Sequence, residues 1–187
     1  VYTTNKFAAP PSKVDRAHLK DGYAQAIVVN SGNANTCAAN GVALAEECCE
    51  LVGKELGIDP QDVLPASTGV IGQPMVIDPF ARGIPAAAAK LAADEQGSTD
   101  AATAIMTTDT KPKTVELEGS NGFRIGGMVK GSGMIAPQLA TMLCVITTDA
   151  VVSAGQMQAA LAVAAEHSFN RIDVDGCMST NDTVLLL

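Results

Sequence analysis

The chain has few aromatic residues and almost no histidine, and these shortages exclude several kinds of protein. Of its 187 residues only 3% are aromatic, none is tryptophan, and two are histidine, His18 and His167. So few aromatic rings leave little surface on which nucleic-acid bases can stack. Because the two histidines lie far apart in sequence, neither a histidine-based metal site nor a Ser-His-Asp triad is expected.

Basic charge and long apolar runs are also scarce. The net charge of −8 gives no attraction to a phosphate backbone or to an anionic membrane surface. No apolar run approaches the roughly 20 residues that a membrane-spanning helix needs. We therefore expect neither nucleic acid nor a membrane as a partner.

The cysteines and acidic residues lack the spacing of a structural metal site or a disulfide framework. The five cysteines form an odd set with one adjacent pair, Cys48 and Cys49, and no CxxC motif. This pattern favours reduced thiols in a cytoplasmic protein. Asp173, Asp175 and Asp182 do not have the spacing of an EF-hand loop, so no metal is expected.

An apolar fraction of 47% predicts a folded chain with an aliphatic core. Helical and strand patterns alternate along it, which indicates a mixed α/β fold in one structural unit. Helices are predicted over about 12–19, 41–56, 78–82, 86–93, 100–104 and 153–167, and strands over 24–29, 114–117, 123–125, 141–147, 172–175 and 179–187. Residues 30–35 are predicted to form a polar loop, which is either a structural turn or a loop whose Asn side chains shape a reaction pocket, and Ser67-Thr68-Gly69 is predicted to form a turn. Gly83 and Pro85 are predicted to break the helix that Asp78 would cap.

The segment Lys130-Gly131-Ser132-Gly133-Met134-Ile135-Ala136-Pro137-Gln138-Leu139-Ala140-Thr141-Met142-Leu143-Cys144 organises the sequence. Two glycines and a proline constrain the backbone before Thr141, which begins a buried-strand pattern. On spacing alone, the Thr141 hydroxyl is either a satisfied polar group or a nucleophile held in place.

Four further segments accompany it, and together they resemble the ornithine acetyltransferase family of arginine biosynthesis. They are Val28-Val29-Asn30-Ser31-Gly32-Asn33-Ala34-Asn35, Ser67-Thr68-Gly69-Val70-Ile71-Gly72, Ile105-Met106-Thr107-Thr108-Asp109-Thr110 and Ser179-Thr180-Asn181-Asp182-Thr183-Val184-Leu185-Leu186-Leu187. The resemblance covers essentially the whole chain. It implies a layered αββα-type sandwich, the fold of self-cleaving ornithine acetyltransferases and aminopeptidases.

The resemblance also implies site residues. Cleavage between Ala140 and Thr141 would make Thr141 the N-terminal nucleophile of a second chain. Thr68 and Gly69 would form the oxyanion hole, while Thr107 and Lys130 would bind substrate together with Thr141. Residues 1–140 would then belong to an α chain and 141–187 to the start of a β chain.

The implied reaction moves an acetyl group from N-acetylornithine to glutamate without a bound cofactor. Whether acetyl-CoA is also a donor stays open, as does the identity of the missing parts. The family's chains are roughly twice this length, so the 187 residues are expected to form one incomplete domain that lacks a later Glu and C-terminal substrate residues. The α and β chains would assemble as a heterotetramer in the cytoplasm.

Two alternatives remain at this point. The chain could belong to an N-terminal-nucleophile aminopeptidase or amidohydrolase, or it could be an inactive scaffold that is never cleaved. Release of ornithine without glutamate would indicate a hydrolase, and an intact mass would indicate a scaffold.

Overall fold

The computed structural model describes residues 1–137 and 142–187. Its helices are α1 (Pro10–His18), α2 (Gly41–Leu56), α3 (Asp78–Ala88), α4 (Glu95–Ala104) and α5 (Ala154–His167), with short 3-10 turns at Pro60–Asp62 and Phe169–Arg171. Its strands are β1 (Ala26–Asn33), β2 (Val63–Val70), β3 (Lys113–Glu118), β4 (Arg124–Lys130), β5 (Leu143–Thr148) and β6 (Thr183–Leu186).

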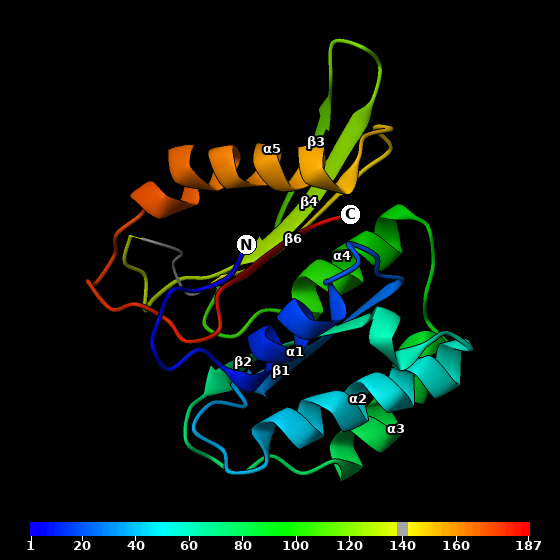
Figure 1. Cartoon of the computed structure of the whole chain (residues 1–187), viewed down its shortest axis with the longest axis vertical. Helices are drawn as coiled ribbons and strands as arrows, with labels where there is room; N and C mark the ends of the chain where they lie inside the picture. The colour runs from blue at the N-terminus through cyan, green and yellow to red at the C-terminus, as the bar shows by residue number, and fades with distance from the viewer. Residues whose placement is uncertain (138–141) are drawn as a thin grey trace.

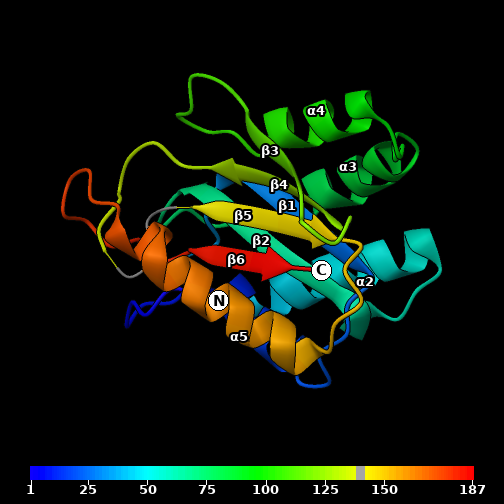
Figure 2. The same ribbon diagram turned by 90° about the horizontal axis from the view of Figure 1, so that it is seen from above.

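The strands form two sheets between outer helices. β1 and β2 pair in parallel, and β3-β4-β5-β6 form a second sheet in which only the β5–β6 pair is parallel. Figure 1 shows α5 on one side of the four-stranded sheet and α2 with α3 beyond β1–β2. Seen from above, the four strands lie side by side with β1 and β2 behind them (Figure 2). The expected αββα-type layering is confirmed.

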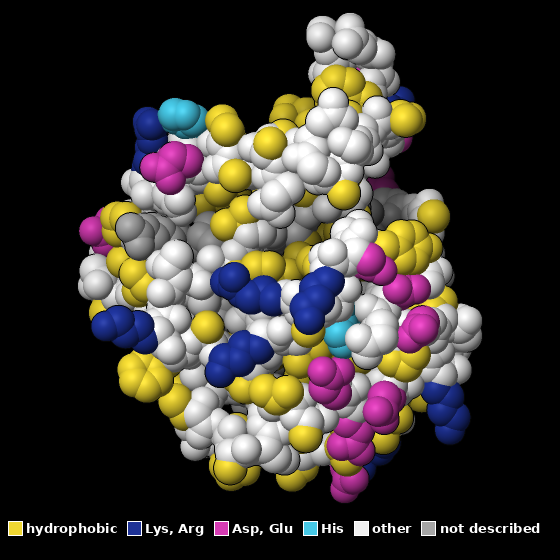
Figure 3. All heavy atoms as spheres, viewed as in Figure 1, with side chains coloured by type: hydrophobic (Ala, Val, Ile, Leu, Met, Phe, Trp, Pro, Cys, Tyr) yellow, Lys and Arg dark blue, Asp and Glu magenta, His cyan; other side chains and the backbone are white. Residues whose placement is uncertain are grey.

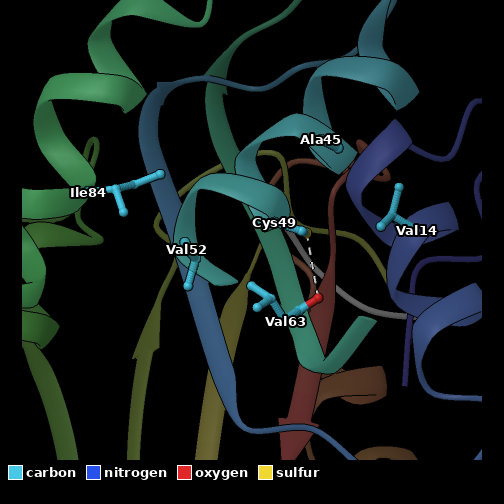
Figure 4. Close-up of a cluster of buried hydrophobic side chains, with 6 residues drawn as sticks. All are labelled: Val14, Ala45, Cys49, Val52, Val63 and Ile84. Carbon is cyan, nitrogen blue, oxygen red and sulfur yellow. Dashed lines mark hydrogen bonds between the residues drawn. The ribbon is translucent and has the colours of Figure 1, made fainter. Parts of the chain in front are cut away.

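Each outer helix covers its sheet with aliphatic side chains. Between α1, α2, α3 and β2 lies a cluster of buried residues, which Figure 4 shows converging from four elements: Val14, Ala45, Cys49, Val52, Val63 and Ile84. Under α5, Leu161 packs with Met142, Cys144 and Val184. Because aromatic residues are so few, these clusters are aliphatic and sulfur-containing, as the composition predicts.

Several local predictions are confirmed. Helix α2 ends at Gly57, whose φ of +69° is the left-handed conformation that favours glycine after a helix. Its acidic side faces solvent, and Figure 3 shows carboxylates gathered in this part of the surface. The helix predicted from about Ser153 to His167 is α5, and the structure adds that Ser153 and Gln156 form a reciprocal capping box at its start. The β3–β4 hairpin is also present, and β4 continues as far as Lys130.

Other local predictions are wrong. The predicted loop at 30–35 instead continues β1 to Asn33, and Ser67-Thr68-Gly69 lies within β2, because the two polar stretches pair with each other in parallel. Asp78 is the first residue of α3, not its cap, and the helix continues through Pro85 to Ala88. Pro85 has no backbone N–H to donate within the helix, but this single lost hydrogen bond does not end α3, in which the apolar side chain of Ile84 is buried.

The separate helix predicted over 86–93 is also wrong, because 86–88 is the end of α3 and 89–93 is not helical. Further differences concern residues 94–100 and 172–175. Asp94, not Asp100, caps α4 by accepting a hydrogen bond from Gly97 N–H at 2.7 Å. Residues 172–175 form no strand, since Asp173 and Asp175 accept hydrogen bonds from nearby turn N–H groups instead. Among the described residues no helix is long and apolar enough to cross a membrane.

Candidate active site

The candidate site lies where the ends of β2 and β4 meet the loop after α4. Lys130, the last residue of β4, is buried with 2% of its surface exposed. Its Nζ donates hydrogen bonds to Thr68 Oγ1 at 2.9 Å and to Thr107 Oγ1 at 2.8 Å. The structure therefore brings together three residues that the sequence singled out separately. Lys130, Thr68 and Thr107 are called the Lys130 cluster below.

The ammonium group has bonding capacity beyond these two hydroxyls. A lysine carries three N–H donors, and two of them have a partner among the described residues. Thr107 is exposed, whereas Thr68 is buried. Because Thr68 Oγ1 accepts from Lys130, its own hydrogen remains available to a third group. Such a cluster can bind an anionic oxygen.

The charge of Lys130 depends on its surroundings. Burial lowers the pKa of the ammonium group, and the positive charge of Lys113 lowers it further. Asp109 and Asp182 oppose this shift with their negative charges. The ammonium group of Lys130 is thus costly to bury, and the nearby carboxylates of Asp109 and Asp182 offset part of this cost.

Thr68 and Gly69 lie in β2, directly opposite β1. In the parallel register Ser31 pairs with Thr68 and Gly32 with Gly69. Gly69 has a φ of +127°, and a Cβ on it would lie 2.3 Å from the backbone carbonyl carbon of Gly32. No side chain fits there, so glycine is required for the two backbones to approach this closely.

The Thr107 loop is held against the same strand pair. Ser31 Oγ donates to the backbone carbonyl of Met106 at 2.7 Å, which fixes the chain just before Thr107. Asp109 accepts from the Thr107 N–H at 3.4 Å. Residues 30–35 were predicted to form a loop and not a strand, and this contact of the Ser31 hydroxyl was not predicted.

Two residues to which the sequence assigned no role also lie here: Asn181 connects the two sheets, and Asp182 holds the residue before β5. Asn181 Nδ2 donates to the carbonyls of Ala34 at 2.6 Å and Ser67 at 2.8 Å. Asp182, which is fully buried, accepts from the Met142 N–H at 3.0 Å. The only sequence signal for them was their position in the last matching segment.

Burial raises the pKa of Asp182 to about 7, although the hydrogen bond from Met142 and the charge of Lys130 act in the opposite direction. A buried carboxyl that titrates near neutrality next to a buried lysine is an arrangement found often at functional sites.

Ala140 and Thr141 lie outside the described residues. The chain that follows this gap lies at the cluster. Lys130 pairs with Leu143 in the β4–β5 register, and Met142 is anchored to Asp182. The described residues 142 and 143, which follow Thr141 in sequence, are thus fixed beside the cluster.

A cavity lies away from the Lys130 cluster. It measures about 340 Å³, lies between the loop after α1, β2, β6 and α5, and is lined mainly by apolar side chains such as Leu19, Leu64, Met157 and Leu161. None of its lining residues belongs to the Lys130 cluster. Among the described residues, no group of three or more His, Cys, Asp or Glu side chains is arranged to hold a metal.

Comparison with solved structures identifies the class of protein to which this fold and site correspond. Ornithine acetyltransferase from Mycobacterium tuberculosis, solved in complex with ornithine, is similar with a TM-score of 0.70 and 33% identity over 75% of each chain. The arginine biosynthesis bifunctional protein ArgJ of Bacillus halodurans has a TM-score of 0.66 and 34% identity over 76% of this chain and 74% of that one.

The sequence comparisons name the family. The ArgJ family model matches residues 1–187, so the chain belongs to the ArgJ family. The arginine biosynthesis bifunctional protein ArgJ of Bifidobacterium longum is 63% identical over all of this chain and 48% of its own length. Glutamate N-acetyltransferase of Methanothermobacter thermautotrophicus is 47% identical, again over all of this chain and 48% of its own. The chain thus spans about half the length of these curated relatives.

Proposed function

We propose that the protein containing this chain is a glutamate N-acetyltransferase, which moves the acetyl group of N-acetylornithine to glutamate. The observation that carries the proposal is the buried Lys130 ammonium group, held between the hydroxyls of Thr68 and Thr107. Family membership and the names of the relatives support it. Since the chain spans about half of those relatives, the activity is proposed for the longer protein.

The nucleophile is proposed to be the Thr141 hydroxyl. It attacks the Ala140 carbonyl carbon, the peptide C–N bond breaks, and the freed amine takes up a proton while an ester forms. Water then hydrolyses the ester and releases a carboxylate at Ala140. The new α-amino group titrates near pH 8, so it can accept the hydroxyl proton during later catalysis.

Acetyl transfer then proceeds in two displacements. Thr141 Oγ attacks the acetyl carbonyl, ornithine leaves as the amine, and an acetyl ester remains on Thr141. The glutamate amine attacks this ester to give N-acetylglutamate and regenerates the hydroxyl. Thr68 and Gly69 stabilise the oxyanion of both tetrahedral intermediates. Lys130 and Thr107 bind a substrate carboxylate, which the open donor capacity of the ammonium group suits.

The same proposal extends to a second acetyl donor, to the assembly of the cleaved chains and to the cellular location. Acetyl-CoA use as a second donor is suggested only by the word "bifunctional" in the relatives' names. The two cleaved chains are expected to stay associated, because β4 of one chain and β5 and β6 of the other share one sheet. Assembly into a heterotetramer is what the resemblance to the family implies. A cytoplasmic location fits the five cysteines, none of which forms a disulfide in the part of the chain described.

The test uses the full-length protein. We expect denaturation to yield two chains, one beginning with Thr141, and we expect ornithine release to depend on glutamate. Thr141→Ala should remain a single chain and be inactive, whereas Thr103→Ala, a change in an exposed threonine of α4, should behave as the wild type. Cleavage of the Thr141→Ala protein would refute the proposal. Ornithine release without glutamate would indicate a hydrolase, and an uncleaved wild type a scaffold.

A further inference from the structure

The carboxylate of Asp109 joins the two parts of the chain that supply the Lys130 cluster. It is buried with 8% of its surface exposed. Oδ1 accepts from the Gly131 N–H at 2.8 Å and from Lys113 Nζ, and Oδ2 accepts from the Thr107 N–H at 3.4 Å. Although burial alone would raise the pKa of Asp109, these hydrogen bonds hold it below its usual value, so the group is an anion.

These contacts close a ring around the cluster. Gly131 follows Lys130 directly, and Thr107 lies two residues before Asp109. One side of the ring is the hydrogen bond from Lys130 Nζ to Thr107 Oγ1, and the other is the Asp109 carboxylate between the backbones of Thr107 and Gly131. A shift of the Thr107 loop away from β4 would therefore break contacts on both sides.

Lys113 fixes the carboxylate from the neighbouring strand. It begins β3, where it pairs with Val129, and its Nζ also donates to the Gly131 carbonyl at 3.1 Å. Its side chain is 39% exposed, so it bears the solvated end of the ion pair while Asp109 bears the buried end. Asp109 itself makes no hydrogen bond to Thr68 or to the Lys130 side chain among the described residues.

We propose that Asp109 is a positioning residue, whose carboxylate holds Thr107 at the correct distance from Lys130 and supplies part of the negative charge that keeps Lys130 an ammonium ion. The inference rests on the proposed function, because it assigns Asp109 to the acetyl-transfer site. It is not a catalytic residue, since it acts through Thr107 and Lys130.

The electrostatic part of the proposal predicts a change in the pH at which Lys130 loses its proton, which a purely structural role of Asp109 would not produce. The charged groups that influence Lys130 are Asp109 and Asp182, which favour the ammonium form, and Lys113, which disfavours it. Replacing Asp109 by Asn removes one favourable charge and leaves Lys113 unpaired, so Lys130 should lose its proton at lower pH. Replacing Lys113 by Met acts in the opposite direction.

The experiment compares Asp109→Asn, Lys113→Met and the double variant in the full-length protein, with Asp100→Asn on the exposed face of α4 as the matched control. For Asp109→Asn we expect kcat/KM with N-acetylornithine to fall about 10- to 100-fold, the size that misplacement by an ångström produces. The alkaline limb of the pH profile should move to lower pH. In Lys113→Met this limb should not move to lower pH, and in the double variant it should lie between those of the two single variants.

A second measurement does not depend on activity. Lysines labelled with ¹³C at Cε report the protonation of Lys130, whose signal is assigned by its loss in Lys130→Arg. A lower titration midpoint in Asp109→Asn supports the proposal even if the wild type transfers no acetyl group, in which case only the proposed function fails. An unchanged midpoint together with an unchanged pH profile, in a wild type that does transfer acetyl, refutes the role of Asp109 alone.

Discussion

Two buried carboxylates, at Asp109 and at Asp15, show how differently this protein treats buried charge. Asp109 accepts three hydrogen bonds at the Lys130 cluster, and its pKa lies below the usual value. Asp15, in α1, is fully buried, and neither of its oxygens has a hydrogen-bond partner among the described residues. Burial raises its pKa to about 8, although the amino group of Val1 and the charge of Arg16 oppose the shift.

The comparison teaches that the degree of burial does not decide whether a carboxyl is charged. Asp15 is the more buried of the two, and its pKa of about 8 keeps it mainly neutral at pH 7, because no hydrogen-bond donor among residues 1–137 and 142–187 compensates the loss of water. Asp109 is charged because Lys113 and two backbone N–H groups replace the water. The molecule thus maintains a buried charge at the cluster and leaves an uncharged acid in α1.

The largest effect is expected when the cation of the cluster is removed. Lys130→Met should lower kcat for acetyl transfer by about 10²–10³-fold, since the hydroxyls of Thr68 and Thr107 lose their donor and the developing or bound anion loses a positive charge. Steady-state kinetics with N-acetylornithine and glutamate measure it. Lys111→Met, which removes an exposed lysine, should leave kcat unchanged. Equal rates for the two variants would contradict the importance given to the cluster.

The second effect concerns the backbone beneath the cluster. Gly69→Ala places a Cβ 2.3 Å from the Gly32 carbonyl carbon at a φ of +127°, and we expect a loss of about 2–4 kcal/mol in unfolding free energy. Gly32→Ala has a φ of +118° and no atom within 4 Å, so it should cost only about 1 kcal/mol. Thermal unfolding of both variants tests the ranking. A Gly32→Ala protein less stable than the Gly69→Ala protein would show that the close approach of the Cβ at position 69 to the Gly32 carbonyl carbon does not cause the loss of stability.

The third test compares the two carboxylates directly. Asp109→Asn should lower stability by about 1–3 kcal/mol, because Lys113 and two N–H groups lose an anionic acceptor. Asp15→Asn removes no hydrogen bond to a described residue, so its cost should stay below about 1 kcal/mol. Melting temperatures at pH 7 are the measurement. A larger fall in melting temperature for Asp15→Asn than for Asp109→Asn would contradict this comparison.

The smallest expected effect is a change in how steeply the unfolding free energy falls as the pH rises. The folded-state pKa of Asp15 is about 8 against 3.8 for the free side chain, so between these values the folded protein binds more protons than the unfolded one. Stability therefore falls as pH rises from 4 to 8, at most on the order of 1 kcal/mol per pH unit from this group. Asp182, with a pKa of about 7, contributes with the same sign.

Asp15→Asn should accordingly flatten, but not abolish, the fall in melting temperature between pH 5 and pH 8. Asp78→Asn, a change in an exposed carboxylate of α3, serves as the control and should keep the wild-type slope. An Asp15→Asn protein that keeps the wild-type slope would show that Asp15 is charged in the folded state.

Elements whose causes are local could be predicted from the sequence. The glycine after α2, the helix that begins after Ser153 and the β3–β4 hairpin each depend on residues within a few positions of one another, and each is confirmed. Lys130, Thr107 and Thr68 were likewise identifiable, but only as members of separate segments that resemble one family.

Tertiary structure alone decided how these segments meet. Thr68 lies 62 positions before Lys130, and no local pattern reveals that their side chains bond. Residues 30–33 read as a loop by composition, yet they form a strand because β2 satisfies their backbone groups. Asp109 combines both kinds of cause. Two of its donors, Thr107 and Lys113, lie within four positions of it, whereas the third, the Gly131 N–H, lies 22 positions away and becomes a neighbour only after β4 has folded against the Thr107 loop.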